Sequence, residues 1–204
     1  MEKAIRRLVI LGASGHGKVV ADIAVKNGYT DIVFLDDDPS LTSCAGYPVL
    51  GPISMLAQTE GDVFAAIGNA GIRRKETERY SDRVFPTLIH PGAIIAPDVK
   101  IGTGSVVMAG AVINPGAVIG KGCIVNTCAS VDHDCVLGDY CHVAPGAHLC
   151  GTVTVGAATW IGAGATVSNN LTICGGCMIG AGAVAVKDIT VPGTYIGVPA
   201  GFRR

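Results

Sequence analysis

From Ile89 to Ile179, an aliphatic residue opens every block of six residues, and the register never slips. The fifth position of each block is mostly small, and the fourth is usually Gly, Asp or Asn. Those three residue types best tolerate the left-handed backbone that a sharp corner needs. Repeats of this kind build solenoids, in which each unit buries its apolar face only by stacking on its neighbours.

Three flat sides of six residues make a turn of about eighteen residues, so the stretch predicts about five coils of a parallel β-helix. The eighteen-residue spacing places four small side chains in one internal ladder: Cys123, Cys141, Thr159 and Cys177. A coiled coil repeats every seven residues and an amphipathic helix near every 3.6. The six-residue period therefore excludes both.

The preceding residues carry a different pattern, in which short apolar runs alternate with helical spacing. Strands are expected at residues 7–11, 31–35 and 62–67, and helices at 19–27, 53–57 and 72–80. This alternation predicts a small parallel sheet, a truncated Rossmann-like unit. We therefore expect an α/β domain at residues 1–85 and a β-helical domain at residues 86–204, with no flexible linker between them.

The composition agrees with a solenoid and limits the classes of binding partner to be expected. Charged residues make up 15% of the chain and aromatic residues 5%, and there are 29 glycines. The formal net charge of −1 gives no reason to expect binding to nucleic acid or to an acidic membrane. The apolar run at residues 8–11 is too short for a signal peptide or a membrane span. A cytoplasmic protein is expected.

Cysteines fit that compartment. Cys123, Cys135, Cys141 and Cys177 occupy the small inward position, where Cys acts as a compact hydrophobe. Cys174 and Cys177 have C-x-x-C spacing, but no second pair or nearby histidine completes a zinc site. Structural packing is therefore favoured over metal or redox chemistry for this pair.

A glycine-rich turn at residues 12–18 follows the first predicted strand. It is not a Mg²⁺-binding phosphate loop, because Val19 replaces the required Ser or Thr, and its glycines do not fit G-x-G-x-x-G. Glycines there still let backbone N–H groups at a helix start approach a pyrophosphate. Asp36 and Asp37, which end the second strand, can accept a hydrogen bond from a ribose or a base. A tight strand–helix turn with solvated aspartates is the alternative.

Gly68 follows the third predicted strand at the same edge of the sheet, and two arginines come shortly after it. Ligands bind at that carboxyl edge in open α/β sheets. Arg73 or Arg74 could meet a phosphate there, although a solvated helix face explains both equally well.

His133 and Asp134 are the strongest chemical candidates in the repeat. His133 is third in its block and should point outward, and Gly151, eighteen residues on, would leave space and a free N–H beside the imidazole. A carboxylate next to histidine can orient it and raise its basicity. Asp134 also fits a purely structural corner. His142 and His148 replace aliphatic residues in the sixth position, which indicates a different surface there.

Four motifs together resemble a known family. They are the hexads that end in Gly-Val-Pro-Ala at residues 197–200, the turn Gly-Ala-Ser-Gly-His-Gly at 12–17, Phe-Leu-Asp-Asp at 34–37 and Ala-Ile-Gly-Asn at 66–69. The chain resembles the PglD/NeuD group of nucleotide-sugar N-acetyltransferases, within the hexapeptide-repeat acyltransferases of left-handed β-helix fold. The resemblance covers the whole chain. It implies transfer of the acetyl group of acetyl-CoA to a UDP- or GDP-linked amino sugar, as in bacillosamine or perosamine synthesis.

The resemblance also implies roles for individual residues. His133 would be the general base and Asp134 the residue that tunes it, although the bacillosamine enzyme has Glu at that place. Residues that match acetyl-CoA contacts are His142 and Gly151. Residues that match the nucleotide site are Ser14, Gly15, His16, Asp36, Asp37 and Gly68. The family implies a homotrimer with active sites between subunits, and no metal.

Four alternatives stay open at this point. A hydroxyl acceptor, such as a sialic acid, needs the same base, so O-acetylation is not excluded. Cys128 could carry the acetyl group as a thioester. A β-helical zinc enzyme would need His133, His142 and His148 to converge on one ion. The chain could also be a non-catalytic scaffold that senses a nucleotide.

Overall fold

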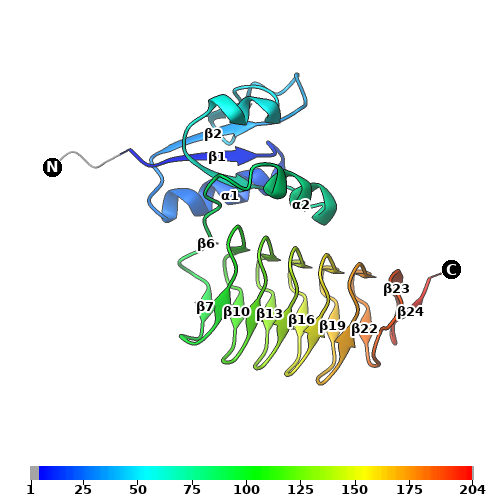
Figure 1. The fold of residues 1–204 in the computed structure, drawn as a ribbon. Coiled ribbons are helices and arrows are strands. Elements are labelled where there is room, and N and C mark those ends of the chain that lie inside the picture. Colours follow the sequence, from blue (N-terminus) through cyan, green and yellow to red (C-terminus); the bar gives the residue numbers. More distant parts are fainter. Residues whose placement is uncertain (1–4, 204) are drawn as a thin grey trace. The chain divides into compact units, whose positions relative to one another are not determined.

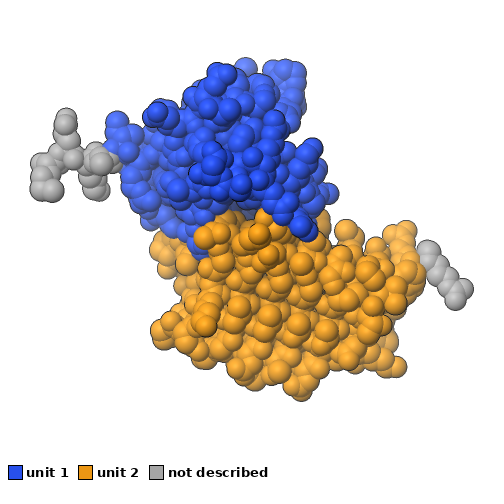
Figure 2. Space-filling model, in the orientation of Figure 1, with its two compact units in different colours: residues 1–88 blue, residues 89–204 orange. Residues whose placement is uncertain are grey.

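A computed structural model describes residues 5–203 (Figure 1). The chain divides into two compact units, residues 1–88 and 89–204 (Figure 2). The sequence places the boundary close by, between residues 85 and 86. No helix within residues 5–203 is long and apolar enough to cross a bilayer.

The first unit is a parallel sheet of the order β2–β1–β5. Its strands are β1 (Arg7–Leu11), β2 (Asp31–Leu35) and β5 (Asp62–Ala65). Its other elements are α1 (Gly15–Lys26), a short hairpin of β3 (Ser43–Cys44) and β4 (Tyr47–Pro48), the 3₁₀ helix η1 (Ile53–Gln58), and α2 (Ala70–Arg79). The predicted alternation of strands and helices is confirmed, and the buried apolar sides of all three strands form the core of this unit.

Helix α1 begins at Gly15, earlier than the expected Val19, so the glycine-rich turn forms its first turn. Close packing explains the glycine at position 17, where a Cβ would lie 2.2 Å from the Gly12 carbonyl oxygen and 3.0 Å from the Phe34 ring. Glycine destabilises a helix through its backbone entropy, mainly when it lies in the helix interior, so its cost is smaller in this first turn.

The second unit is a three-sided solenoid, built from strands of two or three residues (Figure 1). Face one holds β6 (Leu88–Ile89), β9 (Val106–Val107), β12 (Ile124–Val125), β15 (His142–Val143), β18 (Trp160–Ile161), β21 (Met178–Ile179), β23 (Thr194–Ile196) and β24 (Gly201–Phe202). Face two holds β7 (Ile94–Ile95), β10 (Val112–Ile113), β13 (Ser130–Val131), β16 (His148–Leu149), β19 (Thr166–Val167) and β22 (Val184–Ala185). Face three holds β8 (Lys100–Ile101), β11 (Val118–Ile119), β14 (Val136–Leu137), β17 (Thr154–Val155) and β20 (Thr172–Ile173).

Parallel partners in the repeat lie eighteen residues apart, as predicted; Val118 pairs with Val136, and His142 pairs with Trp160. The register changes only after the repeat ends, where Ile173 pairs with Ile189, sixteen residues on. Antiparallel β23 and β24 then finish face one.

The interior consists of the aliphatic first position and the small fifth position of each block. The predicted ladder of small side chains is confirmed. Cys123 Sγ donates to the Gly138 carbonyl at 3.2 Å, and Cys141 Sγ donates to the Gly156 carbonyl at the same distance. Thr159 Oγ1 continues the pattern with the Cys174 carbonyl at 3.1 Å. These two thiols and one hydroxyl thus donate hydrogen bonds to carbonyl groups that would otherwise be buried at the corners without a partner.

Candidate active site

His133 and Asp134 lie at the corner between faces two and three, in the loop that joins β13 to β14. Asp134 has a left-handed backbone, with φ 57°, as the corner requires. Gly116 lies one coil earlier, and a Cβ there would be 2.5 Å from Asp134 Oδ1. The glycine therefore leaves room for the carboxylate.

The imidazole and the carboxylate are hydrogen-bonded, with 2.8 Å between His133 Nδ1 and Asp134 Oδ2. Both side chains are exposed, His133 by 57%, which confirms its outward direction. An ionised carboxylate only accepts, so Nδ1 carries the proton and Nε2 keeps its lone pair. The arrangement suits a general base that acts through Nε2.

Two charges raise the pKa of His133. The largest contribution is the hydrogen bond to Asp134, and the negative charges of Asp132 and Asp134 add to it, while partial desolvation opposes them. Each carboxylate stabilises the imidazolium that forms when the base takes a proton.

Asp132 and Asn114 were not singled out in the sequence. Asp132 Oδ1 accepts hydrogen bonds from the His133 N–H and from Asn114 Nδ2, each at 2.7 Å. These bonds, led by that from Asn114, lower the pKa of Asp132. Asn114 and Asp132 are eighteen residues apart, so their pairing was readable from the repeat.

Gly151 lies against the imidazole, as its spacing predicts. A Cβ at Gly151 would be 2.4 Å from His133 Nε2 and 2.6 Å from Cε1, so only glycine allows the ring its position. Within residues 5–203, the Gly151 N–H makes no hydrogen bond. A backbone donor thus lies next to the nitrogen of the candidate base.

His142 lies on face one and is buried, in contrast to the other histidines of the repeat. Its ring stacks on Trp160 with centroids 4.9 Å apart, and its Nε2 lies 3.1 Å from Asn126 Nδ2. Next to the stack is a largely apolar pocket of about 330 Å³. Its wall includes His142, Trp160, Met178, Gly162, Ala163 and Gly180. Met178 and the glycines were not singled out in the sequence.

The structure separates the residues expected to contact acetyl-CoA. His142 belongs to face one, whereas Gly151 follows β16 at the corner between faces two and three. His148 lies on face two, where its Nδ1 is 2.8 Å from Ser130 Oγ. The three histidines of a zinc site therefore do not converge within one chain. Among the described residues, no group of three or more His, Cys, Asp or Glu side chains could hold a metal ion.

In the first unit, the glycine-rich turn is held by Asp36. Its Oδ2 accepts from the Ala13 N–H at 2.7 Å, and its Oδ1 accepts from the Asp38 N–H at 3.0 Å. Ser14 is the N-cap residue of α1, and its side chain makes no capping bond. Ser14 and Gly15 therefore present the helix start at the carboxyl edge of the sheet, close to Asp36.

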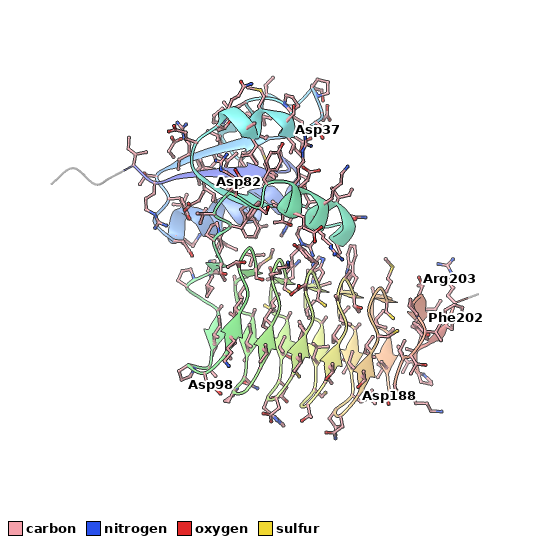
Figure 3. The ribbon with its side chains drawn as sticks, in the orientation of Figure 1. Asp37, Asp82, Asp98, Asp188, Phe202 and Arg203 are labelled. Atoms are coloured by element: carbon pink, nitrogen blue, oxygen red, sulfur yellow. The ribbon has the colours of Figure 1, made fainter. Side chains whose placement is uncertain are left out.

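Asp37 is exposed, and its Oδ1 accepts from the Ile53 N–H at 2.9 Å (Figure 3). The two neighbouring aspartates thus differ. Both oxygens of Asp36 accept from backbone N–H groups, whereas Asp37 uses Oδ1 for one such bond and is exposed to solvent.

At the same edge, His16 is half-buried and Arg73 is fully buried. Burial, helped by the positive charge of Arg73, lowers the pKa of His16 to about 4. Arg73 is only 1% exposed, and its Nη1 donates to the carbonyls of Ile67 at 2.6 Å and Gly68 at 2.9 Å. Arg73 therefore fixes the loop at Gly68, and Arg74 pairs with Glu78 at 2.8 Å. The phosphate contact considered for these arginines has no support in this arrangement.

Two family models match the chain. A model described as the PglD N-terminal domain matches residues 7–80, and one described as bacterial transferase hexapeptide (six repeats) matches residues 86–115. A curated relative, UDP-N-acetylbacillosamine N-acetyltransferase from Bacillus subtilis, is 35% identical over 113 residues. That match spans 52% of this chain and 52% of the relative.

Solved structures match over nearly the whole chain. The acetyltransferase domain of PglB from Neisseria gonorrhoeae, solved in complex with acetyl coenzyme A, is 44% identical with a TM-score of 0.94, and the match covers 98% of this chain and 100% of that one. PerB from Caulobacter crescentus, solved in complex with CoA and GDP-perosamine, is 38% identical with a TM-score of 0.92 and coverage of 98% and 99%. With identity at this level along the full length of both units, the chain belongs to the PglD-type sugar N-acetyltransferases of the hexapeptide-repeat β-helix family.

Proposed function

We propose that this protein transfers the acetyl group of acetyl-CoA to the amino group of a nucleotide-linked sugar. The observation that carries the proposal is the position of the His133 imidazole. Its Nδ1 is hydrogen-bonded to Asp134, and its Nε2 lies next to Gly151. The relatives support the substrates, since one binds acetyl coenzyme A and another binds CoA with GDP-perosamine.

The chemical step is a direct attack. The sugar amine adds to the thioester carbonyl carbon while His133 Nε2 removes a proton from the nitrogen. We assign the Gly151 N–H, which makes no hydrogen bond within residues 5–203, as the donor to the oxyanion that develops on the carbonyl oxygen. The intermediate collapses with loss of the CoA thiolate, which leaves the amide. No acyl-enzyme forms, so Cys128 has no role in this route.

We assign the face-one pocket to the acetyl-CoA arm. The pocket is largely apolar, and the flat stack of His142 on Trp160 forms one wall. A narrow chain with a few polar groups fits such a pocket, because apolar contacts supply affinity while a few polar atoms fix its orientation.

We propose a homotrimer whose active sites form between subunits. The base lies at the corner between faces two and three, and the pocket opens on face one, so one chain cannot bring them to the same thioester. Around a threefold axis, the corner of one subunit can meet face one of the next.

A mixing experiment tests this arrangement. His133→Ala removes the base, and Ala163→Trp fills the pocket, so each variant alone should be inactive. If sites are shared, co-assembly in equal amounts should restore about a quarter of the sites, those that pair an intact base with an intact pocket. Mixtures that stay inactive, although mass analysis shows mixed oligomers, would refute the shared site.

We propose that the carboxyl edge of the first unit binds the nucleotide. The helix start at Ser14 and Gly15 offers N–H groups to the phosphates, and Asp37 offers a carboxylate oxygen to a base or ribose. We also assign His16 and Gly68 to this site, where Arg73 donates to the Gly68 carbonyl and Asp36 holds the turn. Asp37→Ala should raise the KM for the nucleotide sugar and lower the thermal stability only slightly, through loss of the exposed hydrogen bond from the Ile53 N–H. Asp36→Ala should lower the thermal stability even without ligand.

The substrates and the free cysteines of the chain support a cytoplasmic location. The decisive experiment follows CoA release from acetyl-CoA with a panel of UDP- and GDP-linked sugars that differ only in carrying an amino or a hydroxyl group. Amino sugars should be consumed, and His133→Ala should lower kcat by about 10²- to 10⁴-fold. Near-normal turnover by His133→Ala would refute the assigned base, and turnover of hydroxyl sugars alone would refute N-acetylation.

A further inference from the structure

Two thiols touch in the last full coil of the solenoid. Cys174 Sγ and Cys177 Sγ are 3.4 Å apart, and both cysteines are free. Cys174 directly follows β20 of face three, and Cys177 lies in the inward ladder just before β21. Neither residue has a part in the acetyl-transfer chemistry.

Cys174 occupies a place where the repeat otherwise requires glycine. The same column holds Gly102, Gly120, Gly138 and Gly156 in the earlier coils. A Cβ at Gly156 would lie 2.3 Å from the Gly175 nitrogen in the next coil, so the stacking excludes side chains there. Cys174 has a side chain because the coil beyond it is shorter, with Ile173 paired to Ile189. Cys174 is therefore half-buried, whereas Cys177 is 3% exposed, so Cys174 is the more accessible residue of the pair.

The backbone holds the two sulfurs in contact. The Cys174 N–H donates to the Ile189 carbonyl at 2.8 Å, and the Cys174 carbonyl accepts from Thr159 Oγ1 at 3.1 Å. The Cys177 N–H donates to the same Thr159 oxygen at 3.3 Å. One threonine thus fixes both cysteines. A dithiol held this close pays little entropy to form a bond between its sulfurs.

We propose that Cys174 and Cys177 form a redox-active dithiol that closes to a disulfide by exchange with a small-molecule disulfide. The Cys174 thiolate attacks one sulfur of the reagent, which releases one equivalent of the reagent's thiol and leaves a mixed disulfide on Cys174. Cys177 then loses its proton to solvent, attacks Cys174 Sγ and releases the second equivalent. The reagent gains the two electrons that the protein thiols lose, and reduction by an excess of dithiol reverses the change.

The two steps should differ in rate. In the free dithiol, burial, followed by the hydrogen bond and the charge of Cys174, raises the pKa of Cys177 to about 11. Once Cys174 carries the mixed disulfide, its hydrogen bond and charge are gone, but the burial of Cys177 remains and still holds the pKa of that thiol above its ordinary value. Only the thiolate attacks a disulfide, so the resolving step is slow at neutral pH. The mixed disulfide on Cys174 should accumulate first and should close faster as the pH rises.

The test treats the full chain with oxidised glutathione, traps free thiols by alkylation at timed intervals, and maps the peptides by mass. Three observations are expected in order. The peptide with Cys174 first gains glutathione, and it then loses that adduct together with two hydrogens as the disulfide closes. Dithiothreitol finally restores both thiols. Cys177→Ser should stop at a stable Cys174 adduct. The substitution suits the fold, because Ser105 fills the same column and donates to the Gly120 carbonyl at 2.9 Å.

Cys128→Ser is the matched control, since it removes an exposed thiol in another corner and should leave closure unchanged. Three outcomes would overturn the proposal. They are no reaction at Cys174, a wild-type adduct that persists as it does in Cys177→Ser, and closure that proceeds equally in Cys174→Ser. Wild-type closure that is absent in both single variants would establish it.

Discussion

Replacing Gly151 with alanine should disable the candidate base without disturbing the fold. The new Cβ would lie 2.4 Å from His133 Nε2, 2.6 Å from Cε1 and 3.1 Å from Cδ2. Ordinary contacts between such atoms are about 3.5–4.0 Å, so the ring must retreat by about 1 Å. The ring cannot do this and keep its 2.8 Å bond to Asp134, because both groups are attached to one tight corner.

The size of the effect follows from that displacement. A misplacement of about 1 Å in a catalytic group costs about 10²-fold in rate. We therefore expect kcat to fall about 100-fold, with a smaller change in the KM for acetyl-CoA. The free energy of unfolding should change by less than about 1 kcal/mol, since Gly151 needs no left-handed backbone and the clash is with an exposed, movable ring.

Steady-state kinetics with saturating amino sugar, together with urea unfolding, measure both quantities. Gly201→Ala is the control, because a Cβ at that exposed glycine meets no atom within 4 Å. It should leave kcat and stability unchanged. A Gly151→Ala enzyme with wild-type kcat and an intact fold would refute the reasoning, since the imidazole would then not need the position that the glycine allows.

Three further predictions concern charge, burial and stacking. Asp134→Asn removes the main cause of the raised pKa of His133; because the base acts unprotonated, the acid limb of the kcat/KM profile should shift to lower pH, and an unshifted limb would contradict the coupling. For His16, the unfolded chain takes up a proton near the ordinary pKa of 6.5 and the folded chain only near 4. The unfolding free energy should therefore fall by about 3 kcal/mol as the pH drops through that window, and urea titrations should show His16→Gln to be free of this loss. Trp160→Ala removes the stack on His142 and should raise the KM for acetyl-CoA about tenfold with little effect on kcat, and an unchanged KM would argue against the pocket's assignment.

The solenoid could be predicted from the sequence because its signal repeats in every block. Every block of six residues has the same aliphatic, small and corner positions, so one atypical residue does not obscure the register. The direction of His133 and its contact with Gly151 followed from the same arithmetic. The pairing of Asn114 with Asp132 followed from the same eighteen-residue spacing. It was missed because asparagine and aspartate at a corner do not indicate a catalytic site as clearly as histidine does.

Other features depend on packing that the six-residue repeat does not predict. Burial of His142 comes from the stack with Trp160 and from its neighbours on face one, so its place in the block did not predict it. The early start of α1 depends on the approach of Gly17 to Gly12 and Phe34, which are separated in sequence. The different roles of Asp36 and Asp37 depend on which backbone N–H groups each oxygen reaches.

The eighteen-residue register sets how this protein can change in length. Duplication or loss of one entire coil keeps every column aligned, because each coil contacts only the coils beside it. An insertion of a single residue would instead turn all later side chains to the wrong side of the wall. The contact of His133 with Gly151 spans adjacent coils, so a coil added between them would part the imidazole from its glycine. The face-one pocket spans His142 to Ala181, and Asn114 donates to Asp132 from the coil before the base, so coils added before Asn114 or beyond Ala181 would leave the base, its partners and the pocket intact. The solenoid can therefore be lengthened on either side of residues 114–181, but not within them.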